Sequence, residues 1–220
     1  MTQRKATLLS LTASSSELAP VLSDAASTVE QTEPGTLDWL AVDAGDANQY
    51  AVFDVFASQA ARVAHFDGAV AATLTARGDE LLAANREPGT LGTVNHYDVL
   101  AEVPARSGTP TLFTSIELRA APGQAEALAA FLTGGASLVA ESEPGTLRWF
   151  ALRHEGDAAR FAIVDWFADE AGRAAHFEGR VAAALKDAAA TLVDGGWEAV
   201  LAAVRHASVL SSFSRVNAAG

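Results

Sequence analysis

The strongest constraint on the fold is that this chain of 220 residues contains the same sequence twice. The phrase Glu-Pro-Gly-Thr-Leu-x-Trp occupies residues 33–39 and returns at residues 143–149. The pattern Asp-x-Phe-Ala-x(7)-His-Phe occupies residues 54–66 and returns at residues 165–177. The second pair is offset by one residue more than the first, which a surface hairpin loop between the two patterns allows. The chain is therefore an internal duplication with a period of about 110 residues.

The composition indicates a globular protein, with 50% hydrophobic and 19% charged side chains. The formal net charge of -12 argues against nucleic acid and membrane partners, because phosphate-rich surfaces require clustered Lys and Arg. No apolar run reaches the roughly 18 residues that a membrane span needs, and the first residues do not resemble a signal peptide. We therefore expect a cytoplasmic protein.

The residue types also limit the chemistry. The chain has no cysteine, which excludes disulfides, thiolate nucleophiles and iron–sulfur clusters. It also lacks the His-x(3)-His and His-Glu-x(2)-His spacings of common metal sites. Any redox chemistry must therefore come from the substrate, a bound cofactor or oxygen itself.

Each half is predicted to run strand, helix, strand, strand, helix, strand. Apolar residues recur at helical spacing from Leu18 to Val29, whereas residues 36–42 alternate as a strand does. In the first half the expected elements are 5–12, 18–31, 36–42, 49–56, 57–74 and 92–103. In the second half they are 109–119, 124–140, 146–153, 160–167, 170–190, a short helix at 197–203 and a strand at 205–213.

This order is typical of the split βαβ, or ferredoxin-like, arrangement, in which helices cover one face of a four-stranded antiparallel sheet. The predicted class is α+β, with domains at 1–104 and 109–217. Because each sheet leaves one face uncovered, we expect the two repeats to pack sheet to sheet as a pseudo-dimeric α+β barrel. Whether this intramolecular pseudo-dimer pairs again as a homodimer stays open.

The duplicated phrases resemble the antibiotic biosynthesis monooxygenase family of the dimeric α+β barrel superfamily. The resemblance rests on the Glu-Pro-Gly-Thr-Leu entry to a strand and the later Asp-x-Phe-Ala-x(7)-His-Phe segment, and it spans essentially the whole chain. It implies oxidation of a small aromatic phenol or quinol by molecular oxygen without metal or flavin. The expected partners are thus a small aromatic substrate and oxygen.

The resemblance also implies catalytic positions. His65 and His176 stand where the family usually has a histidine on the second helix, and histidine handles protons near neutral pH. Where the family commonly has tryptophan, this chain has Phe56 and Phe167. The asparagine and tryptophan of haem-degrading relatives are missing, which disfavours haem chemistry.

Further candidates for the site come from the repeat itself. Asp54 and Asp165 lie two residues before Phe56 and Phe167 and so share a strand face with them. Each aspartate is expected either to orient a histidine or bind substrate, or to pair with Arg62 or Arg173. The remaining substrate-binding candidates are Trp39, Trp149, Trp166, His96 and His206.

Three functions remain open from the sequence. The first is a cofactor-independent monooxygenase, with His65 or His176 as proton acceptor or orienting group. The second is a non-catalytic barrel protein that binds a small molecule or is associated with stress. The third, less favoured, is a haem-binding or haem-degrading relative.

Overall fold

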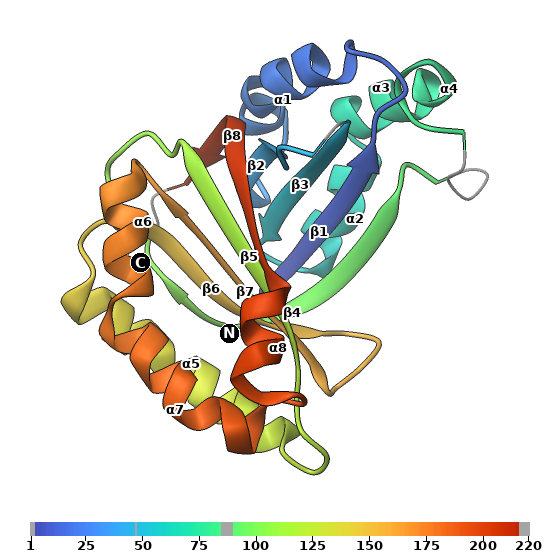
Figure 1. Cartoon of the computed structure of the whole chain (residues 1–220). Coiled ribbons are helices and arrows are strands. Elements are labelled where there is room, and N and C mark those ends of the chain that lie inside the picture. The colour runs from blue at the N-terminus through green and yellow to red at the C-terminus, as the bar shows by residue number, and fades with distance from the viewer. Residues whose placement is uncertain (1–2, 47, 85–89, 216–220) are drawn as a thin grey trace. The chain divides into compact units, whose positions relative to one another are not determined.

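The computed structural model describes residues 3–46, 48–84 and 90–215 (Figure 1). The first repeat contains β1 (Lys5–Thr12), α1 (Leu18–Thr32), β2 (Thr36–Asp43), β3 (Gln49–Phe56), α2 (Gln59–Phe66), α3 (Ala69–Ala76), α4 (Gly78–Leu81) and β4 (Thr93–Val103). The second repeat contains β5 (Leu112–Arg119), α5 (Ala125–Ser142), β6 (Thr146–His154), β7 (Arg160–Phe167), α6 (Glu170–Phe177), α7 (Arg180–Leu192), α8 (Gly196–Ala203) and β8 (Val204–Ser214). The class is α+β with two tandem ferredoxin-like repeats, as predicted.

The chain divides into two compact units that do not coincide with the repeats. Unit 1 comprises the described residues of Met1–His96 together with Ala207–Arg215, and unit 2 those of Tyr97–His206. In unit 1 the antiparallel strand order is β1-β3-β2-β8, and in unit 2 it is β5-β7-β6-β4. Each sheet is therefore completed by the last strand of the other repeat.

The exchanged strands occupy equivalent places. In unit 1, β8 pairs with β2, with Trp39 opposite Phe213. In unit 2, β4 pairs with β6, with Val103 opposite Trp149. The repeat boundaries 1–104 and 109–217 thus describe the duplication in the sequence, whereas the folded units exchange their final strands; residues 1–2 and 216–217 lie outside the described part of the chain.

In each unit the helices bury an apolar face against one side of the sheet. In unit 2, α5 and α7 pack on the sheet together with α8 (Figure 1), around a core that includes Trp149, Leu132 and Leu185. In unit 1 the equivalent core includes Trp39 and Leu74. Burial of such aliphatic and aromatic side chains stabilises each unit by about 1.5–3 kcal/mol per residue.

The second helix of each repeat is interrupted, contrary to the single helices predicted at 57–74 and 170–190. The break falls at Gly68 between α2 and α3 and at Gly179 between α6 and α7. A Cβ atom on Gly179 would lie 2.6 Å from Glu143 Oε1, and one on Gly68 would collide with Glu33 Oε1. The break therefore makes room for a carboxylate from the end of the preceding long helix.

The predicted short helix near residue 197 is present as α8, whereas α4 was not predicted. Among the described residues, none of the helices combines the length and the apolar character needed to cross a membrane.

Candidate functional site

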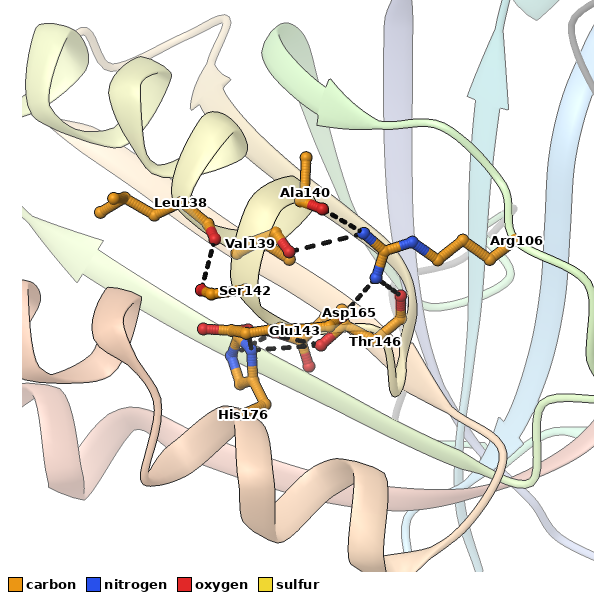
Figure 2. Close-up of polar contacts among 9 residues, drawn as sticks. All are labelled: Arg106, Leu138, Val139, Ala140, Ser142, Glu143, Thr146, Asp165 and His176. Atoms are coloured by element: carbon orange, nitrogen blue, oxygen red, sulfur yellow. Dashed lines mark hydrogen bonds and ion pairs between the residues drawn. The ribbon is translucent and has the colours of Figure 1, made fainter.

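A histidine flanked by two carboxylates forms the centre of unit 2 (Figure 2). His176 Nδ1 lies 2.6 Å from Glu143 Oε2, and His176 Nε2 lies 3.4 Å from Asp165 Oδ2. The hydroxyl of Thr146 donates to the same Glu143 oxygen at 3.4 Å. All four residues are buried. The site is therefore a carboxylate–histidine–carboxylate cluster shielded from bulk water.

Unit 1 contains the same cluster. His65 Nδ1 lies 2.5 Å from Glu33 Oε2, and His65 Nε2 lies 3.7 Å from Asp54 Oδ1. The Thr36 hydroxyl donates to Glu33 Oε2 at 3.1 Å. Both histidines and both aspartates are at most 7% exposed. The duplication thus preserves the arrangement as well as the residue types.

Local sequence determines where each group lies. Glu143 is the C-cap residue of α5, and Pro144-Gly145 then turns the chain so that Thr146 begins β6. His176 lies in the last turn of α6, whose N-cap Asp169 accepts a hydrogen bond from the Gly172 amide at 2.8 Å. A helix end and a capped short helix therefore bring the acid and the base together.

The phenylalanines of the duplicated pattern pack on the histidines. The rings of Phe167 and His176 are 5.4 Å apart, and those of Phe56 and His65 are 5.2 Å apart. Asp165 and Phe167 do share a strand face, because both contact His176. Arg173 forms an ion pair with Glu170 at 2.6 Å, so the nearer charged neighbour of Asp165 is the histidine.

The aspartates hold protons more tightly than ordinary carboxyls. Burial raises the pKa of Asp165 from 3.8 to about 6, against the opposing effect of His176, and the Glu143 carboxylate raises it further. Burial likewise raises the pKa of Asp54 to about 7. Burial lowers the pKa of His176, but Asp165 and Glu143 together outweigh it, so the net direction is upward. The cluster therefore favours the imidazolium form of His176 more than water does.

The Asp165 carboxylate also has unused hydrogen-bonding capacity. Neither of its oxygens has a hydrogen-bond partner within the described residues, and the 3.4 Å approach to His176 Nε2 is long for a charge-assisted hydrogen bond. The pKa values of both groups are raised, that of Asp165 to about 6, so a proton delivered when His176 is already an imidazolium rests on Asp165. The pair can therefore accept a proton from a bound molecule and keep an imidazolium beside the resulting anion.

A cavity of about 170 Å³ lies against the cluster of unit 2. Among the described residues, His176 is the one ionisable side chain in its wall. The wall also contains Trp149, Phe177, Leu185, Trp197 and Leu201. Such a mostly apolar site with one ionisable group suits a small, mostly apolar molecule.

The equivalent cavity of unit 1 is nearly filled, at about 20 Å³. Its wall includes His65, Asp54, Trp39 and Leu91. The two tryptophans of the duplicated phrase thus line equivalent cavities, although each is only 1% exposed.

The other candidates lie around or away from these clusters. His206 Nδ1 lies 3.1 Å from the Thr114 hydroxyl, and its ring meets the edge of Phe177 at 5.5 Å. His96 takes the equivalent place beside Thr7 in unit 1. Trp166 packs on Phe150 and is absent from the wall of the 170 Å³ cavity.

Sequence reasoning missed the glutamates of the clusters. Glu33 and Glu143 were assigned only to a turn, because Pro-Gly by itself explains a turn. The available signal was the identical glutamate three residues before an identical threonine in both repeats. A turn requires neither of these side chains.

No group of three or more histidine, cysteine, aspartate or glutamate side chains within the described ranges could hold a metal ion.

Fold and site together define a duplicated ferredoxin-like protein with one buried carboxylate–histidine–carboxylate cluster in each repeat. Residues 111–190 match the family model described as antibiotic biosynthesis monooxygenase. The second repeat contains a domain of this family. The first repeat shares its duplicated phrases.

Solved structures of similar fold span nearly the whole chain. A candidate monooxygenase from Fusobacterium nucleatum is 11% identical, with TM-score 0.79, over 98% of this chain and 96% of that one. A candidate monooxygenase from Lactobacillus acidophilus is 13% identical, with TM-score 0.77, over 97% of each chain. An anthrone oxidase-like protein is 15% identical, with TM-score 0.56, over 97% and 94%. At these identities the likeness shows the fold alone; a comparison with curated sequences found no match.

Proposed function

We propose that the protein is a monooxygenase that oxidises a small phenol- or quinol-type molecule in the unit 2 cavity. The observation that carries the proposal is the apolar 170 Å³ cavity whose one ionisable wall group is His176. The Asp165–His176 pair accepts the hydroxyl proton of the substrate, and the imidazolium then stabilises the substrate anion. The apolar wall limits access of water to that anion.

The electrons come from the substrate. Oxidation of a phenol to a quinone removes four electrons, and these reduce one molecule of oxygen. One oxygen atom enters the ring as the new carbonyl, and the other leaves as water with the two hydrogens lost by the substrate. In this proposal the protein needs to hold the substrate, take and return protons, and admit oxygen.

The test is oxygen uptake by the full chain with anthrones, naphthoquinols and catechols, measured in the presence of a chelator. We expect uptake with at least one compound, and a fall in kcat of about 10²–10⁴-fold in His176→Ala, the range for loss of a general acid–base group. His65→Ala is the matched control, because its cluster adjoins a cavity of only about 20 Å³, and it should retain uptake.

A second function is favoured by one observation. The unit 1 cluster persists beside a nearly filled cavity, which is what a structural role for the cluster would produce. The protein would then bind small aromatic molecules without turning them over. Quenching of Trp149 and Trp197 fluorescence by the same compounds, without oxygen uptake, would support this function. A shift of the haem absorption band on titration would instead favour the haem-binding alternative.

A further inference from the structure

Arg106 holds the backbone that carries the unit 2 glutamate. Its guanidinium donates to the carbonyl oxygens of Ala140 at 2.8 Å and Thr146 at 3.0 Å, and to that of Glu143 (Figure 2). Its own amide donates to Leu147 at 3.0 Å. Arg106 thus fastens the end of α5 to the start of β6 on both sides of the Pro-Gly turn.

Arg215 makes the same set of contacts in unit 1. Its guanidinium donates to the carbonyl oxygens of Glu30 at 2.5 Å, Thr36 at 2.9 Å and Glu33 at 3.4 Å. Its amide donates to Leu37 at 2.7 Å. The two arginines are 109 residues apart, one less than the shift of 110 between the duplicated Glu-Pro-Gly-Thr-Leu phrases, and they occupy one structural position in the two units.

The contacts are specific to the shape and charge of arginine. The last carbonyls of a helix have no partner within the helix, and a cation near them is favoured by the helix dipole. The planar guanidinium reaches several carbonyls at once, which an ammonium group cannot do in the same geometry. Because Glu143 is the C-cap residue of α5, these bonds fix the residue whose carboxylate lies 2.6 Å from His176 Nδ1.

We propose that Arg106 and Arg215 are positioning residues that set the Glu143–His176 and Glu33–His65 pairs. Each arginine follows the exchanged strand of its unit, Arg106 after β4 and Arg215 after β8. Arg106, in the segment between the two repeats, therefore organises the histidine of the second repeat, and Arg215 of the second repeat organises the histidine of the first. The consequence for catalysis rests on the proposed function, whereas the positioning itself does not.

The test is NMR titration of the histidine rings in the full chain, which has five histidines. In Arg106→Met the Glu143 contact loosens, so we expect the pKa of His176 to fall by about one unit while that of His65 stays unchanged. Arg215→Met should do the reverse. Arg106→Lys should also lower the pKa of His176 and leave that of His65 unchanged, with a smaller shift than in Arg106→Met. This second variant keeps the test valid where the methionine variant does not fold.

Arg119→Met is the matched control, because the exposed Arg119 pairs with Asp157, away from both clusters, and should move neither histidine. Unchanged titration of His176 in both Arg106 variants would overturn the proposal. So would equal shifts of His65 and His176 in either variant, since that pattern indicates general loosening. The titration needs no substrate, so an absence of oxygen uptake by the wild-type chain would remove the proposed function and leave this result standing.

Discussion

The two cavities have nearly the same walls and very different volumes. Leu9, Val52 and Val70 of unit 1 correspond to Ile116, Ile163 and Val181 of unit 2, and both walls contain the duplicated tryptophan, histidine and phenylalanine. They differ in two places. Asp54 lines the unit 1 cavity, whereas Asp165 is absent from the unit 2 wall, and Leu91 in unit 1 is replaced by residues of α8 and the start of β8 in unit 2. The volumes are about 20 and 170 Å³.

The comparison shows that the cluster and the cavity are separate properties, although the same sequence pattern is present in both units. The carboxylate–histidine–carboxylate cluster is common to both units, whereas space for a ligand is found in unit 2. The histidine motif alone therefore does not indicate whether there is space for a ligand beside the cluster. Among the described residues, α8 and the start of β8 contribute wall residues to the larger cavity that have no counterpart in the wall of the smaller one.

The largest effect should come from filling each cavity with the same side chain. Ala182 lines the unit 2 cavity and Ala71 the unit 1 cavity. Ala182→Leu should weaken binding of a naphthol by at least about tenfold with little loss of stability, because the added carbons enter empty space. Ala71→Leu should leave binding unchanged and lower the free energy of unfolding by about 1–3 kcal/mol through overpacking.

Fluorescence titration and urea unfolding measure the two effects. Equal loss of stability in both variants would show that the cavities do not differ in solution. Unchanged naphthol binding in Ala182→Leu would place the ligand elsewhere.

The next effect concerns the pH dependence of stability. The folded pKa values of Asp54 and Asp165 are raised to about 7 and about 6 from 3.8. A raised pKa stabilises the folded state below the unfolded value, and this contribution is lost as pH rises through the folded pKa. The loss should therefore extend from pH 4 to about 7 for Asp54 and to about 6 for Asp165.

Asp54→Asn and Asp165→Asn remove these contributions one at a time. Relative to wild type, each variant should gain stability as pH rises, by a few kcal/mol in order of magnitude. Urea unfolding from pH 4 to pH 8 measures the gain. The gain should level off at a lower pH for Asp165→Asn than for Asp54→Asn. A gain that is flat with pH in both variants would contradict the raised pKa values.

The smallest effect tests whether the clusters are equivalent. A Cβ on Gly179 meets Glu143, and one on Gly68 meets Glu33. Gly179→Ala and Gly68→Ala should each lower the free energy of unfolding by about 1–2 kcal/mol, because the carboxylate must move away. NMR titration should show a lower pKa for the histidine of the altered unit.

Gly134→Ala is the matched control. An added Cβ there meets nothing within 4 Å, and Gly134 lies inside α5. This change should raise stability by about 0.5–1 kcal/mol. If Gly179→Ala lowers the free energy of unfolding and Gly68→Ala does not, the unit 1 glutamate is not held by the same contacts as the unit 2 glutamate.

Much of the fold follows from the sequence because local patterns repeat. Strand alternation and the duplicated Pro-Gly turn predict the order of elements, and the pattern around Asp165 and Phe167 places both beside His176. The helix breaks at Gly68 and Gly179 could not be found this way. A Cβ at either glycine would meet a glutamate more than thirty residues earlier in the chain and a carbonyl of the preceding helix. A glycine in an alanine-rich stretch is by itself compatible with a continuous helix.

The strand exchange was hidden by the duplication itself. Because β4 and β8 are copies of one strand, the pattern in the sequence fits pairing with either repeat equally well. The arginines were missed for a related reason: Arg106 was assigned only to the joint between the repeats. The cavity depends on how residues after the second helices pack, which is a property of tertiary structure.

The exchange of final strands also governs when the protein can fold during synthesis. Unit 1 begins with the first strand of the chain, yet Asp38 of β2 pairs with Ser214 of β8. The ribosome must therefore release the chain as far as Ser214 before the edge of β2 in unit 1 gains its partner. Contacts so distant in sequence slow folding and leave an unpaired strand edge exposed meanwhile. Unit 2, whose strand β4 is made before its other strands, can complete its sheet first.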